Sequence, residues 1–133
     1  MGAWGSESCS NDSVWDCLVA EDIHQMTQTE ANVTLRETWK HRWVTPFEKL
    51  GVVVWLLTHG LKVPKTKLKE VLPYIDEELK PKNLESWRDE EERKNCLLQE
   101  RKEIEAALKA GGQGKERHVK GLMEKIGDFM EGR

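Results

Sequence analysis

One segment near the middle of the chain joins a helix-start signal to an apolar interior and a helix-stop signal. Thr45-Pro46-Phe47-Glu48 supplies a threonine N-cap, a proline at the first helical position and a glutamate at the third. Residues 50–57 are almost all apolar, and His59-Gly60 then provides a cation near the terminal carbonyls and a glycine suited to a helix end. The valines at 52–54 also suit a core strand, but the bracketed length favours a helix, and we predict a central buried helix over residues 46–59.

Two helices are predicted before this centre. Apolar residues recur at three- and four-residue spacing over residues 12–27, with Asp12 or Ser13 as the cap. A second helix is predicted over residues 30–43, where successive i, i+4 positions place two indoles on one core-facing stripe. That stripe consists of Leu35, Trp39 and Trp43.

Two further helical segments follow the central one. The pattern after Pro64 predicts a helix that Pro73 kinks or splits, because proline cannot donate its backbone hydrogen bond, and that ends at Pro81. Residues 84–108 are highly charged, and the polar stretch 88–95 has helix-forming composition but nothing to bury. We expect a projecting solvated helix there, or two helices with a break.

The end of the chain combines a glycine-rich stretch with a regular amphipathic pattern. Residues 111–114 predict a flexible linker, and residues 115–133 predict a C-terminal helix with one apolar stripe. The expected partner-binding stripe consists of Val119, Leu122, Met123, Ile126, Phe129 and Met130. It can pack on its own domain, on a partner or second copy, or on a membrane, which its polar face of mixed charge makes the least favoured.

Size and composition bound the fold to one domain. The chain has 133 residues, of which 34% are charged and 38% hydrophobic, with a mean hydropathy of -0.69. We predict an all-α fold of five to six helices, in which residues 1–110 form one compact domain to which residues 111–114 tether the C-terminal helix. Six tryptophans supply much of the limited apolar material for its core.

Charge, cysteines and the lack of long apolar runs indicate the class of protein. A net charge of -3 argues against a chain that chiefly neutralises phosphates. The three cysteines show no paired spacing, so we expect reduced thiols and neither a disulfide framework nor a zinc site. The N-terminus lacks the pattern of a signal peptide, and no apolar run approaches the roughly 20 residues of a membrane span. We therefore expect a cytoplasmic protein without a cofactor.

Two groups of residues are candidates for chemistry or ligand binding. Asp12, Asp16 and His24 could share one side of the first helix and form a metal or acid/base set, although a cap and a solvated face explain them more simply. Cations interleave with Trp39 and Trp43 and recur after Pro64, a pattern that could stack bases and hold phosphates. Those cations are Arg36, Lys40, Arg42, Lys65 and Lys67, within the stretches Arg36–Lys49 and Lys62–Lys69. Core placement of both indoles would weaken this interpretation.

The opening of the chain resembles a known group of sequences. Met1-Gly2-x-Trp4-Gly5, followed by Asn11-Asp12 and Asp16, is similar to the start of small, largely bacterial domains of unknown function that begin Met-Gly-x-Trp-Gly. The resemblance covers about the first eighteen residues well. It implies an α-helical fold and no established activity.

These observations favour recognition over catalysis. No reactive residues converge in the pattern, whereas a charged helix and an amphipathic one offer surfaces to another protein or to a second copy of the chain. We predict a non-enzymatic protein-binding protein of the kind that includes immunity proteins, antitoxins and inhibitors, a comparison by class only. The first alternative is a nucleic-acid binder using the two basic stretches. The second is a metal-dependent enzyme using Asp12, Asp16 and His24.

Overall fold

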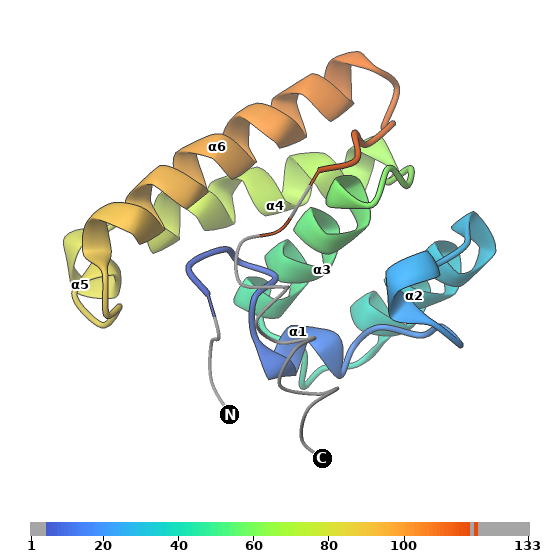
Figure 1. Cartoon of the computed structure of the whole chain (residues 1–133), viewed down its shortest axis with the longest axis horizontal. Helices are drawn as coiled ribbons and strands as arrows, with labels where there is room; N and C mark the ends of the chain where they lie inside the picture. The colour runs from blue at the N-terminus through green and yellow to red at the C-terminus, as the bar shows by residue number, and fades with distance from the viewer. Residues whose placement is uncertain (1–4, 118, 120–133) are drawn as a thin grey trace.

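The computed structural model describes residues 5–117 and 119 (Figure 1). In these residues the fold is all-α, as the sequence predicts, with one isolated bridge between Lys62 and Gln113 and no strand. The elements in chain order are α1 (Asp12–Trp15), the 3-10 turn η1 (Ile23–Gln25), α2 (Gln28–Lys40), α3 (Pro46–Thr58), α4 (Lys65–Glu78), α5 (Pro81–Leu84) and α6 (Glu90–Lys109). Across the described ranges, no helix has both the length and the apolar character needed to cross a bilayer.

The predicted central helix is confirmed as α3. Thr45 and Glu48 form a reciprocal capping box, with the Thr45 backbone N–H donating to Glu48 Oε1 at 2.8 Å. Every residue from Leu50 to Thr58 is buried, and Gly60 follows with a φ of 74°. Figure 1 shows α4 and α6 side by side along one side of α3, with α1 and α2 on the other, and α3 contacts all four. The core therefore forms around α3.

The prediction of one long first helix over residues 12–27 is wrong. The Asn11 side chain, and not Asp12 or Ser13, caps α1, which ends at Trp15. A separate capping box at Thr27 then begins α2. Short polar side chains along this stretch bond to nearby backbone groups and so compete with a continuous helix.

The placement of the two predicted core indoles is half right. Trp39 is partly buried against the core, but α2 ends at Lys40 and His41 is extended, with a ψ of 129°. Trp43 consequently lies in a turn beyond the helix, where 60% of its surface is exposed. The i, i+4 spacing predicts a shared face only as far as the helix continues.

The proline-containing segment and the charged segment also differ from expectation. Pro73 lies inside α4 without splitting it, and α5 begins at Pro81. The charged segment forms the single helix α6 from Glu90, but its polar residues do have something to bury: Arg93 and Glu100 are fully inaccessible to solvent.

Residues 111–114, predicted to be a flexible linker, are fixed to the loop between α3 and α4. Gly112 donates to Ala107 O at 2.7 Å and accepts from the Val63 N–H at 2.9 Å, and Gly114 donates to Leu61 O at 3.1 Å. Gly112 has a φ of 101°, and a side chain there would clash with Val63 O. Glycine is needed here for close backbone approach. Of the predicted C-terminal stripe, Val119 is buried in the core; the remaining members lie outside the described residues, namely Leu122, Met123, Ile126, Phe129 and Met130.

Candidate functional site

A buried polar network attaches the N-terminal segment to α6. The Ser8 backbone N–H and hydroxyl donate to the two carboxylate oxygens of Glu100 at 2.8 and 2.6 Å. Arg93 Nη1 donates to Ser6 O at 2.9 Å and Ser8 Oγ at 3.1 Å, and Nη2 reaches Glu78 at 3.3 Å. The Arg93 guanidinium also lies 4.2 Å from the centre of the Trp87 ring.

Burial sets the electrostatics of this network. Desolvation raises the pKa of Glu100 to about 7 despite the opposing charge of Arg93 and the bonds from Ser8. Burial, with help from Glu7 and Glu100, also raises the pKa of the Cys9 thiol well above its usual value. Such a thiol is a poor nucleophile at neutral pH.

A second, partly buried ion pair extends the network to the segment after α6. Arg117 donates to both carboxylate oxygens of Glu7, at 3.0 and 2.5 Å, and also bonds to Glu103 on α6. Burial opposes the charge of Arg117, but the bonds and charges of Glu7 and Glu103 together outweigh it and raise the pKa of Arg117, so the guanidinium stays charged. The three pieces of chain are thereby joined, and these side chains serve the fold.

The structure separates the roles of Asp12, Asp16 and His24. Asp12 is the first residue of α1 and Asp16 its C-cap, whereas His24 lies with its ring centre 5.7 Å from that of Trp15. Within residues 5–117 and at 119, no three His, Cys, Asp or Glu side chains are placed to hold a metal ion. Cys9, Cys17 and Cys96 are free and buried.

The two basic stretches meet at one indole. Lys49 Nζ lies 5.3 Å and Lys67 Nζ 5.0 Å from the centre of the Trp39 ring. The Trp39 N–H donates to Glu70 at 2.9 Å, and the Glu70 carboxylate lies 3.7 Å from Lys49, so part of this positive charge is balanced. The other predicted cations, Arg36, Lys40, Arg42 and Lys65, are exposed.

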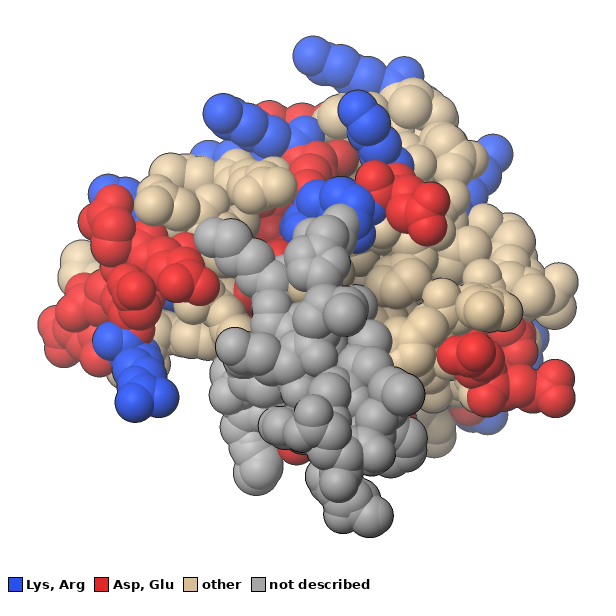
Figure 2. All heavy atoms as spheres, viewed as in Figure 1, with Lys and Arg blue, Asp and Glu red and all other residues tan. Residues whose placement is uncertain are grey.

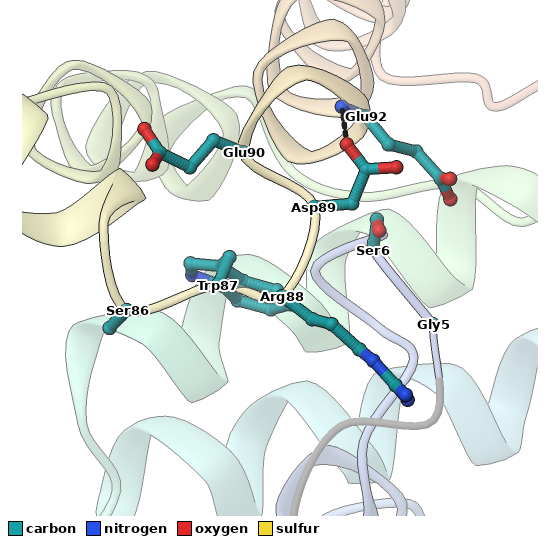
Figure 3. A pocket seen from close by; sticks show the side chains of 8 residues that line it. All are labelled: Gly5, Ser6, Ser86, Trp87, Arg88, Asp89, Glu90 and Glu92. Carbon is teal, nitrogen blue, oxygen red and sulfur yellow. Dashed lines mark hydrogen bonds between the residues drawn. The ribbon is translucent and has the colours of Figure 1, made fainter.

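A wide cleft lies beside Trp87, between the N-terminal segment and the loop before α6 (Figure 3). It encloses about 1020 Å³. Carboxylates line much of it, and Figure 2 shows Asp and Glu gathered over this α5 end of the molecule. Asp89 is already engaged, since its carboxylate accepts from the Glu92 N–H at 3.0 Å and caps α6. One wall is formed by Gly5, where the described part of the chain begins.

A smaller pocket has Trp43 in its wall, and we call it the Trp43 pocket. It encloses about 200 Å³ and lies between the loop after α1, the end of α2 and the turn before α3. Its walls are Asp16, Cys17, Val19, Glu37, Thr38, His41, Trp43 and Val44. All of these belong to the described part of the chain.

Trp43 is presented on this pocket in a fixed orientation. The Val44 N–H donates to His41 O at 3.3 Å and closes the turn, and the His41 ring stacks on the indole with centres 5.7 Å apart. His41 is in turn 3.4 Å from a Glu37 oxygen. Val19, 41% exposed, adds a second apolar side chain. The result is an apolar, aromatic contact surface in which the ring of His41 supports the indole.

The chemistry of the pocket walls is acidic and unreactive. Asp16 and Glu37 contribute carboxylates, and none of the eight wall residues is Lys or Arg. Burial, with the nearby Glu48 and Asp16, raises the pKa of the Cys17 thiol to about 11, so it remains protonated. The sequence did not predict this site, because the spacing of Trp43 from Trp39 placed it in the core.

Comparison with known proteins finds no relative: no protein-family model, curated protein or solved structure matches the chain. The resemblance of the first eighteen residues to domains of unknown function stays a prediction.

Proposed function

We propose that this chain is a non-enzymatic protein-binding protein whose contact surface is centred on Trp43. The supporting observation is a tryptophan that is 60% exposed yet held by the stacked ring of His41. Tryptophan is among the residues that most often dominate protein interfaces, because its indole removes a large apolar area from water on binding. A side chain already held in place loses less entropy when the partner arrives.

The position of this residue argues against a structural role for it. Single exposed aliphatic side chains are ordinary on a protein surface, but a large exposed indole beside a pocket is a feature of binding sites. Immunity proteins, antitoxins and inhibitors remain the class that such a small helical binder would join, by comparison only. A second copy of this chain is one possible partner.

Affinity capture with matched variants tests the proposal. Tagged wild-type chain and Trp43→Ala are expressed in the native host and their captured proteins are compared by quantitative mass spectrometry. Leu98→Ala serves as the control, because Leu98 is 39% exposed on α6, away from the pocket. We expect a partner protein whose captured amount falls at least tenfold with Trp43→Ala and stays at the wild-type level with Leu98→Ala. Equal capture by all three chains would remove Trp43 from the proposal.

The nucleic-acid alternative gains one specific observation. Trp43 is exposed and adjoins the exposed cations Lys40 and Arg42, as a platform for stacking bases requires. The acidic walls of the Trp43 pocket and the net charge of -3 oppose it. Fluorescence anisotropy with a labelled oligothymidine tests this alternative. Nucleic-acid binding requires that the affinity for the oligonucleotide falls steeply with salt and is lower in both Trp43→Ala and Lys40→Ala.

A further inference from the structure

We infer that the Trp43 pocket receives one cationic side chain, a lysine or arginine, from the partner protein. The inference depends on the proposed function and specifies its ligand chemistry. Three properties of the pocket lead to it: the charge of its walls, an unsatisfied hydroxyl and the face of an exposed indole.

The wall charges are complementary to a cation. Asp16, at the end of α1, and Glu37, on α2, supply carboxylates from two separate elements, and no Lys or Arg lines the pocket. Glu37 lies 3.7 Å from Arg36, an exposed cation outside the pocket that an incoming cation would replace. An ammonium or guanidinium group between two carboxylates gains charge-assisted hydrogen bonds. An anionic side chain in the same place would be repelled.

The hydroxyl of Thr38 requires a partner that the described structure does not supply. Thr38 lines the pocket and is only 2% exposed, yet its Oγ1 has no hydrogen-bond partner among the described residues. Buried polar atoms are nearly always bonded, so the Thr38 hydroxyl would gain a bond if an incoming donor displaced the atoms that cover it. Lysine and arginine carry donors only, and they fit a pocket whose other polar walls accept.

Trp43 completes the site for a long cationic side chain. Its exposed ring can pack against the methylene stem and attract the charged end through the cation–π interaction. The volume of about 200 Å³ is smaller than typical small-molecule pockets and suits a single side chain. A partner segment would thus lie across Trp43 and Val19 and insert one residue.

Titration with a matched pair of probes tests this assignment. N-acetyl-arginine methylamide is compared with N-acetyl-citrulline methylamide, which has nearly the same shape but no charge, by following backbone and indole N–H signals in NMR spectra of the full chain. We expect the arginine probe to shift saturably the signals of Thr38, His41 and Trp43 at millimolar concentration, and the citrulline probe to bind at least threefold more weakly.

Variants separate the charge of the site from its shape. Glu37→Gln should lower the affinity for the arginine probe about three- to fivefold. Glu105→Gln, at an exposed position on α6, should leave that affinity unchanged. Equal shifts by both probes, or no shift by either, overturn the inference. If Trp43→Ala loses a cellular partner while Glu37→Gln keeps it, the protein-binding proposal stands and the cation pocket fails.

Discussion

The fold buries the Glu100 carboxylate completely. Because the charged form is disfavoured there, the free energy of unfolding should depend on pH. Burial raises the pKa of Glu100 from 4.5 to about 7, so the native chain holds a proton that the unfolded chain releases across this range. Its contribution to stability is complete below pH 4.5 and is lost as the pH rises through 7, by on the order of 3 kcal/mol. Urea unfolding at pH 5 and pH 8 should show this loss in the wild type.

The variant Glu100→Gln tests whether Glu100 causes this loss of stability with rising pH. In Glu100→Gln the position cannot ionise, so the difference between pH 5 and pH 8 should shrink by most of that amount. The carboxylates of Glu30, Glu70 and Glu77 have lowered pKa values and titrate below this window. Burial lowers the pKa of His59, and that shift adds stability as the pH rises within the same window, so the wild-type loss is the Glu100 part less the His59 part. An unchanged slope in Glu100→Gln would show that another group titrates.

Arg93 should be the most costly cation to remove. Its guanidinium is fully buried and bonds to Ser6, Ser8 and Glu78, so Arg93→Ala leaves these groups without their partner and Glu100 without nearby positive charge. We expect a loss of about 3–5 kcal/mol in the free energy of unfolding by urea. Arg36→Ala removes an exposed cation whose ion pair with Glu37 lies at the surface, and it should change stability by less than about 0.5 kcal/mol. Similar losses in both would contradict the buried network.

At this scale the sequence predicts local partners better than distant ones. The bond between Thr45 and Glu48 was predicted, because both residues lie within one turn of helix. The bonds of Ser8 to Glu100 join residues 92 positions apart, and no pattern within a segment signals them. The exposure of Trp43 was missed for a related reason: it depends on where α2 ends.

Gly51 shows how closely two elements approach each other. A Cβ at this position would lie 2.7 Å from the Ser8 carbonyl oxygen and would overlap the Val14 side chain. Helix propensity alone predicts that Gly51→Ala stabilises α3 by up to about 1 kcal/mol. We expect the opposite sign, a loss of about 1–3 kcal/mol in thermal or urea unfolding, because backbone must shift. A more stable Gly51→Ala would show that the N-terminal segment does not pack there.

Among the elements, strong caps decided which predictions succeeded. The helix α3 has the start and end that its capping box and Gly60 indicate. The first predicted helix failed, because apolar spacing continues over residues 12–27 whereas the capping box at Thr27 begins a new helix. The glycines at 111–114 were interpreted as flexibility, whereas Gly112 and Gly114 permit close backbone contacts.

In the whole molecule, both ends of the described chain close on α3 and α6. Arg117 bonds to Glu7 and Glu103, its backbone N–H donates to Thr58, and Val119 is buried. A chain ending at Ala110 loses all of these contacts and should unfold at a clearly lower temperature than a chain ending at Lys120. Equal melting temperatures would mean that residues 111–119 add nothing to the fold.

Photocrosslinking shows whether Trp43 touches the partner protein. The photoreactive amino acid benzoylphenylalanine replaces Trp43 in one chain and Leu98 in another, and each is irradiated in living cells of the native host. We predict a discrete crosslinked protein from position 43 and none of that mass from position 98. A product from position 98 alone, or the same product from both positions, would contradict the proposed binding surface.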